Sequence, residues 1–171
     1  MFPASQLEIL AYNRTVSDLN GLSPEAFIEK LAEVGTVKPT AEPVPQQSGV
    51  VCTYVAGKWY EVQFDGSQLD PADVIDSLDV ARLQNAILSP ILGINDIRPD
   101  KRIDFVGGIR GTDELQQRVD SGTAAAAFSM YPTSIEQLFQ VSDVGQVMPP
   151  KSTWFEPKLR SGLFVHQFEK Y

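Results

Sequence analysis

The segment 149–162, PPKSTWFEPKLRSG, concentrates cations, hydroxyls and aromatic side chains in a short span. A phosphate or carboxylate is bound by positive charge together with directed hydrogen-bond donors. Lysine supplies a point charge, a hydroxyl adds a single donor, and arginine offers a planar fork. The alternative is a capped turn whose aromatic residues fill the core while the lysines lie in solvent. The first interpretation predicts an anion site that contains Lys151, Ser152, Thr153, Lys158 and Arg160.

Two other segments could contribute to the same site. Asn13 and Arg14 lie at the far end of a predicted strand, where an arginine can meet an anion at the carboxyl edge of a sheet. In the sequence FVGGIRGT, Gly107 and Gly108 would let a ligand approach the backbone near a helix N-terminus. The alternatives are a salt bridge from Arg14 to Asp18 or another carboxylate, and a plain strand-to-helix turn. FVGGIRGT is neither a P-loop nor the G-x-G-x-x-G fingerprint.

The residue types that usually perform catalysis are sparse. The single histidine, His166, lies in the apolar sequence LFVHQF, and the single cysteine, Cys52, lies among valines, which predicts structural roles for both. Ser152 and Thr153 have no adjacent partner that would activate them. The catalytic residues and any cofactor therefore stay unassigned. We expect no metal site, because the three aspartates at 70, 73 and 76 are typical of a solvated helix start.

Composition sets the class of protein. With 171 residues, of which 43% are hydrophobic, the chain can form one domain with a real core. The net charge of −8 argues against binding of nucleic acid or of an anionic membrane over the surface as a whole, because both are negatively charged. No apolar run approaches the ~18 residues that a membrane span needs, and MFPASQLEIL lacks the features of a signal peptide. A cytoplasmic location is therefore predicted.

Periodicity and capping signals predict the elements that must position these residues. Residues 5–16 are expected to form a strand, and residues 21–35 a helix with Ser23 as its N-cap and Pro24 in its first turn. The proline-rich residues 36–48 are expected to be a surface connection. Residues 49–64, GVVCTYVAGKWYEVQF, predict a β-hairpin that turns at Ala56-Gly57.

The second half alternates between helices and strands. We expect a turn or helical stub over 70–77 and a helix over 78–93 that Pro90 bends or ends. Further predicted elements are a strand at 103–108, a helix at 112–122 capped by Thr112, a strand at 123–130, a helix at 134–145 with a Ser134–Gln137 capping box, and a last strand at 162–168.

The order of these elements predicts the fold class. The β-α-β-α rhythm of the C-terminal part indicates a parallel strand pair with a right-handed crossover. The expected class is α+β or mixed α/β, with one mixed sheet that includes the hairpin and with helices packed on the sheet. The whole chain, 1–171, is expected to be a single domain. Exposed edge strands of this sheet would make a homodimer possible.

Several sequence blocks resemble, in order, an uncharacterised bacterial and archaeal family called domain of unknown function 1015. They are ILAYNRTVSDLNGLSPEAFIEKL, AGKWYEVQF, LDVARLQNAILSPILGI, IDFVGG and VMPPKSTWFEPKLRSGL, of which the PPKST-aromatic-x-PK block is the most specific. Members of the family are about twice this length. Their N-terminal half resembles the ParB/sulfiredoxin-like fold and carries an Asp-Gly-His-His-Arg motif similar to one in a serine kinase, and this chain lacks that motif. The resemblance therefore implies an excised C-terminal half, with Met1 as an added start.

The resemblance also implies a function, because genes of the family often lie beside serine-biosynthesis genes. The leading hypothesis is a domain that binds a small anionic metabolite, such as phosphoserine, and supports phosphoryl chemistry with the N-terminal half of its parent protein. The parent would be a phosphatase or phosphotransferase, and this fragment alone would be inactive. The alternative is a structural or interaction half without a ligand of its own.

Overall fold

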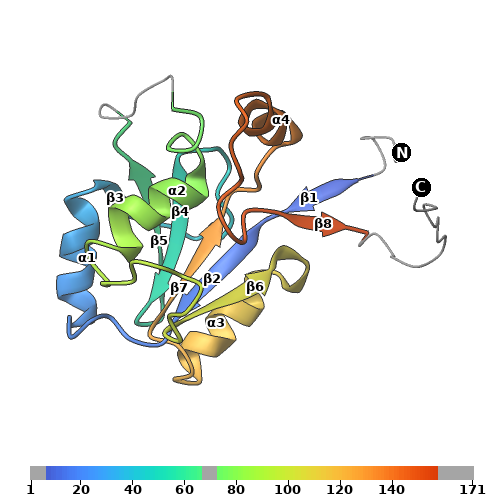
Figure 1. Ribbon diagram of the computed structural model, residues 1–171. Helices are drawn as coiled ribbons and strands as arrows, with labels where there is room; N and C mark the ends of the chain where they lie inside the picture. The colour runs from blue at the N-terminus through green and yellow to red at the C-terminus, as the bar shows by residue number, and fades with distance from the viewer. Residues whose placement is uncertain (1–6, 67–72, 158–171) are drawn as a thin grey trace, which may run out of the picture.

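A computed structural model describes residues 7–66 and 73–157, which form a six-stranded sheet with helices on its faces and a separate two-stranded sheet (Figure 1). The strand order of the large sheet is β3-β5-β4-β7-β2-β6. Its strands are β2 (Tyr12–Val16), β3 (Gly35–Pro39), β4 (Val50–Val55), β5 (Lys58–Phe64), β6 (Ile103–Gly107) and β7 (Ala126–Met130). The two-stranded sheet pairs β1 (Glu8–Leu10) with β8 (Trp154–Glu156).

Short helices connect the strands. They are α1 (Pro24–Ala32), α2 (Asp79–Leu83), the π-helix η2 (Gln84–Leu88), the 3₁₀ turn η3 (Gly108–Arg110), α3 (Asp113–Asp120) and α4 (Ile135–Asp143). None of the helices in the described part of the chain is long and apolar enough to cross a membrane.

The α+β class with helices on the sheet is confirmed, but the direction of the strands differs from the prediction. Every hydrogen-bonded strand pair of the large sheet is antiparallel. β6 and β7, which α3 connects, do run in the same direction, yet β2 lies between them and pairs with both. The two strands predicted to be parallel are therefore present, but the expected mixed sheet is wrong, because a strand from the start of the chain inserts between them and every hydrogen-bonded pair is antiparallel.

The predictions that rest on turn residues and helix caps agree with the structure. The hairpin of β4 and β5 turns at Ala56 and Gly57, whose φ angles of 49° and 77° match the tight turn that was predicted. The Ser23 side chain accepts a hydrogen bond from the amide of Ala26 at the start of α1. The capping box of α4 forms as predicted.

Other elements differ from their predictions. The single strand expected over 5–16 is divided into β1 and β2, and part of the expected connection 36–48 belongs to β3. The Thr112 side chain makes no capping hydrogen bond to α3. The helix expected over 78–93 becomes α2, η2 and a turn that contains Pro90. The last predicted strand, 162–168, lies outside the described residues.

The sheet separates two apolar clusters. The larger cluster lies under α1 and α2 and includes Phe27, Leu83 and Phe128, whereas the smaller one lies under α3 and includes Leu115 and Ala127. Side chains alternate between the faces of a strand. In β2, Asn13 and Thr15 therefore face the α3 side, and Arg14 and Val16 face the larger cluster.

Candidate functional site

Arg14 is a charged residue in the apolar layer beneath α2. It is paired with Phe105 of β6 on one side and Phe128 of β7 on the other, and only 2% of its surface is exposed. Its guanidinium donates hydrogen bonds to the carbonyl oxygens of Tyr12 and Lys151, the latter at 3.1 Å. A guanidinium carries five N–H donors. Two are used, so three stay available for a ligand as far as the described residues show.

Burial changes the acid–base behaviour of Arg14. Desolvation lowers the pKa of the guanidinium from 12.5 to about 10, so the group still carries its charge at neutral pH. Among the residues that the structure describes, no carboxylate forms an ion pair with Arg14. The alternative partner considered from the sequence, Asp18, instead lies 3.6 Å from Arg102. A buried charge without a counter-ion is costly, and a bound anion would offset that cost.

The loop before β8 brings Lys151 to Arg14, as the sequence predicted. Lys151 has a left-handed backbone with φ 60°, and its carbonyl accepts from Arg14. Its ammonium lies 3.4 Å from the Tyr12 hydroxyl and 5.3 and 5.6 Å from the ring centres of Tyr12 and Phe105. These contacts hold two cations, Arg14 and Lys151, beside the same phenylalanine ring.

The hydroxyls of this loop differ in what they do. Ser152 is 5% exposed, and its hydroxyl donates to the carbonyl of Pro149. The Ser152 carbonyl in turn accepts a hydrogen bond of 3.0 Å from the hydroxyl of Thr133. Ser152 therefore shapes the loop in this structure, whereas Thr153, which is partly exposed, shows no side-chain hydrogen bond among the described residues.

Asn13 and the two glycines make structural contacts. The Asn13 side-chain oxygen accepts from the amide of Met130 at 2.9 Å and so extends the pairing of β2 and β7. A Cβ at Gly107 would lie 2.6 Å from the Trp154 ring. The Gly108 amide donates to the carbonyl of Ala11 at 2.8 Å, so this amide is not available to a ligand here. Two further predicted site residues, 158 and 160, lie outside the described residues.

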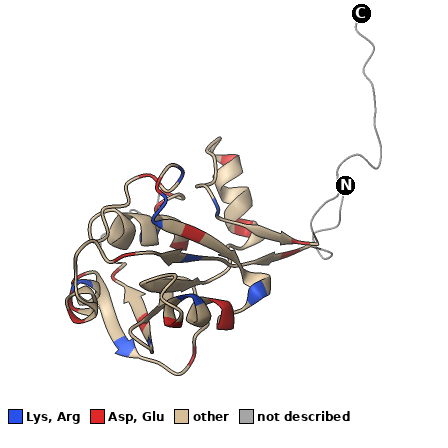
Figure 2. Cartoon of the chain, turned by 90° about the horizontal axis from the view of Figure 1, so that it is seen from below, with Lys and Arg blue, Asp and Glu red and all other residues tan. Residues whose placement is uncertain are grey.

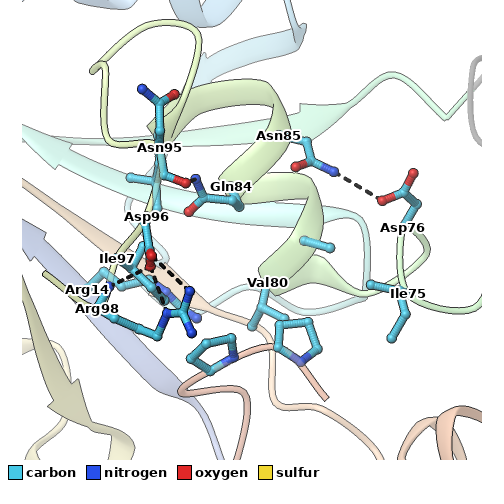
Figure 3. A pocket seen from close by; sticks show the side chains of 14 residues that line it. Arg14, Ile75, Asp76, Val80, Gln84, Asn85, Asn95, Asp96, Ile97 and Arg98 are labelled. Atoms are coloured by element: carbon cyan, nitrogen blue, oxygen red, sulfur yellow. Dashed lines mark hydrogen bonds and ion pairs between the residues drawn. The ribbon is translucent and has the colours of Figure 1, made fainter. Parts of the chain in front are cut away.

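A pocket of about 460 Å³ opens beside Arg14, between the sheet, α2–η2 and the loop that precedes Lys151 (Figure 3). Its apolar walls come from Ile75, Val80, Ala81, Leu88, Ile97, Pro149 and Pro150. Its polar groups are Arg14, Asp76, Gln84, Asn85, Asn95, Asp96 and Arg98. Asp96 and Arg98 form an ion pair at 2.9 Å, whereas Arg14, the other cation of the lining, has no carboxylate partner within residues 7–66 and 73–157.

Sequence reasoning missed the polar residues that η2 and the loop after it bring to this pocket. Gln84 and Asn85 interrupt an apolar helix pattern, and this interruption is the signal in the sequence that could have pointed to them. The π-helix that positions them cannot be predicted from periodicity. No group of three or more His, Cys, Asp or Glu side chains in residues 7–66 and 73–157 could hold a metal ion.

The comparisons with known proteins support both the family and the fold. The sequence model of the family described as "Protein of unknown function (DUF1015)" matches residues 1–81 and supports membership of the chain in this family. The match includes the first two sequence blocks that carry the resemblance and the start of the third. No curated protein matches the sequence.

The fold is similar to solved structures entitled free serine kinase. Two mutants of that protein in complex with AMP match with TM-scores of 0.53 and 0.54 and identities of 11% and 10%, and one in complex with ADP matches with 0.51 and 11%. In each case the match covers 89% of this chain and 55% of the other. The chain thus spans about half the length of these structures, and the likeness shows a shared fold.

Proposed function

We propose that this chain binds a small phosphorylated metabolite in the pocket beside Arg14 and supports phosphoryl chemistry together with a further part of a longer protein. One observation carries the proposal: a buried, charged guanidinium has no carboxylate partner among the described residues and lines a pocket of about 460 Å³. A phosphate would supply the missing negative charge and enough oxygens for the three remaining N–H donors.

Each of the other groups has a role in this proposal. Lys151 adds a second positive charge next to the lining residue Pro150, and its contacts with Tyr12 and Phe105 hold the ammonium. Ser152 maintains the loop, and Thr153 offers a hydroxyl. Lys158 and Arg160 stay candidate ligands because they follow in the same segment. Any base or nucleophile would come from another part of the longer protein, so this chain alone is expected to show little or no turnover.

The ligands of the solved structures with a similar fold support the proposal of a phosphorylated ligand. The solved structures with this fold are entitled free serine kinase and are complexes with AMP or ADP. Nucleotides are phosphate ligands, and a serine kinase handles a phosphoryl group. Together with the family resemblance, these titles make phosphoserine the first phosphate ester to test.

Calorimetry on this chain tests the proposal directly. We expect phosphoserine and inorganic phosphate to bind and serine to bind far more weakly, because the charge on Arg14 pairs with phosphoryl oxygens. Arg14→Met keeps the volume of the side chain and removes its charge, so it should weaken phosphate binding by about tenfold or more. Arg110→Met, an exposed arginine near α3, is the matched control and should bind as the wild type does.

A second candidate function has its own observation. Phe139 and Val144 of the α4 region and Val147 after it are 57%, 56% and 87% exposed, which is unusual for three large apolar side chains so close in sequence. A structural half that docks onto another part of a longer protein would cover such a surface. Failure of every phosphate ligand to bind, with the wild-type chain folded, would favour this second function over the first.

A further inference from the structure

Arg14 is almost completely covered, although it lines the pocket. Only 2% of its surface is exposed, and its guanidinium already donates to the carbonyl oxygens of Tyr12 and Lys151. A phosphate needs several N–H donors within about 3 Å of its oxygens. So small an exposed area cannot give a phosphate that contact. An anion therefore reaches the guanidinium fully only when one of the groups that cover it moves.

The parts of the chain around Arg14 differ in how firmly they are held. Phe105 and Phe128 belong to the strands that pair with β2 on its two sides, so backbone hydrogen bonds fix them. The helix α2 is anchored in the larger apolar cluster through residues such as Val80. A third part of the cover is the segment 149–152, Pro-Pro-Lys-Ser, which we call the strap. The strap lies outside both the sheet and the helices.

Hydrogen bonds from side chains hold the carbonyl groups of the strap. Within the strap, the Ser152 hydroxyl donates to the carbonyl of Pro149 at 2.5 Å. From the sheet, Arg14 donates to the carbonyl of Lys151 at 3.1 Å. The hydroxyl of Thr133, a residue that is 7% exposed, donates to the carbonyl of Ser152 at 3.0 Å. A single hydrogen bond contributes modestly to stability, so the strap can leave this position while the sheet stays folded.

The backbone at and before the strap favours such a movement. Gly145, which follows α4, has φ 69°, and glycine adopts both signs of φ readily. Val147, between this glycine and the strap, is 87% exposed, so no packed core opposes motion there. Lys151 has φ 60°, which a residue with a Cβ rarely adopts. Release of its carbonyl from Arg14 would let Lys151 return to an ordinary backbone conformation.

We propose that the strap is a gate over Arg14, that Thr133 holds it in the covering position, and that it moves away when a phosphate binds. This inference rests on the proposed function and adds control of access to that site. The carbonyl of Lys151 and the oxygens of a phosphate compete for the same guanidinium. The Lys151 ammonium can still reach the anion, because it lies on a flexible stem. Thr133 is a positioning residue, since its hydroxyl contacts the strap.

Such a gate lowers the apparent affinity for phosphate. When only a fraction of the molecules is uncovered, the apparent dissociation constant is the intrinsic constant divided by that fraction. Loss of the Thr133 hydroxyl removes a hydrogen bond of the covered state and takes this donor from the Ser152 carbonyl. The uncovered fraction then rises, and phosphate binds more tightly even though the folded protein loses stability. Loss of a ligand contact would weaken binding, and loss of a purely structural contact would leave the affinity unchanged.

Calorimetry with inorganic phosphate tests the gate through Thr133→Val, which keeps the branched shape of the side chain and removes its hydroxyl. We expect this variant to bind phosphate about threefold to tenfold more tightly than the wild-type chain, the effect of one hydrogen bond lost from the covered state. Thr133→Ser keeps the hydroxyl and should bind as the wild type does. An affinity of Thr133→Val that equals or falls below that of the wild type would overturn the gate and leave the phosphate site standing.

A measurement on the wild-type chain decides even where Thr133→Val does not fold. Trp154 follows shortly after the strap and packs against Tyr12, with ring centres 5.3 Å apart. Its fluorescence should change as phosphate saturates the site, and the change should persist in Trp59→Phe, which removes the other tryptophan of the sequence. Phosphate binding seen by calorimetry without any change in Trp154 fluorescence would contradict the gate alone. Failure of phosphate to bind to either the wild type or folded Thr133→Val would overturn the phosphate site and the gate together.

Discussion

At the scale of single residues, the sequence located the important cation but not the surroundings that make it important. Arg14 and Lys151, 137 positions apart, were predicted to lie close together, and a hydrogen bond joins them. The burial of Arg14 could not be predicted, because it depends on Phe105 and Phe128 from two other strands. Asn13 was a predicted ligand residue, yet its side chain bonds to the backbone of Met130, a contact fixed only by strand order.

The buried carboxylate of Asp79, next to the pocket residue Val80, makes the stability of the protein depend on pH. Its carboxylate accepts a hydrogen bond of 2.6 Å from the amide of Gly49, and burial, the larger effect, raises its pKa above the ordinary 3.8. The carboxyl group of Asp79 thus binds its proton more tightly in the folded protein than in the unfolded chain. Protonation of Asp79 therefore contributes to the free energy of unfolding. This contribution is fully present below the pKa that Asp79 has in the unfolded chain, and it is lost as pH rises through the raised pKa of the folded protein.

We therefore expect Asp79→Asn to gain free energy of unfolding relative to the wild type as pH rises through that window. Asparagine can still accept from the Gly49 amide, and it has no charge to desolvate. Chemical denaturation at a series of pH values measures the difference. The exposed Asp113→Asn should show no comparable trend, and a difference for Asp79→Asn that is constant with pH would contradict the account.

At the scale of elements, predictions succeeded where the signal was local. The hairpin depends on two turn residues, and the caps of α1 and α4 depend on residues within one turn of the helix start. β8 was not predicted, because Trp154–Glu156 becomes a strand only by pairing with β1. Likewise η2 depends on how its residues pack on the sheet, and no period in the sequence encodes a five-residue step.

The close approach of β6 and β8 makes Gly107 sensitive to substitution. A Cβ there would lie 2.6 Å from two carbon atoms of the Trp154 ring, so Gly107→Ala must displace that ring. We expect a loss of about 1–3 kcal/mol in the free energy of unfolding, the usual cost of overpacking. Thermal or chemical denaturation measures it.

A double-mutant cycle identifies the cause. When Trp154→Ala has already removed the ring, Gly107→Ala should cost much less than in the wild-type background. An equal cost in both backgrounds would show that the glycine acts through its backbone and not through contact with Trp154.

At the scale of the whole molecule, the pocket exists because distant parts of the chain meet on one face of the sheet. β2 supplies Arg14, α2 and η2 supply one wall, and the loop before β8 supplies another. The class was predictable from the alternation of helical and strand patterns. The insertion of β2 between β6 and β7 was not, because strand order is set by long-range packing.

The arm formed by β1 and β8 is separate from the six-stranded sheet. It projects from the body in Figures 1 and 2, and in Figure 2 it carries acidic positions, which are Glu8 and Glu156. A two-stranded sheet of three-residue strands has little stability of its own in water. The match covers only 55% of the solved structure with this fold, so we propose that a further segment of a longer protein contacts this arm.

The central claim is that Arg14 holds an anion, and a crystal structure of this chain grown with inorganic phosphate or phosphoserine tests it most directly. The account predicts a phosphate in the pocket with its oxygens about 3 Å from the guanidinium nitrogens of Arg14. Electron density for the anion at another site, or a pocket with Arg14 bonded only to the Tyr12 and Lys151 carbonyls at saturating ligand, would contradict it.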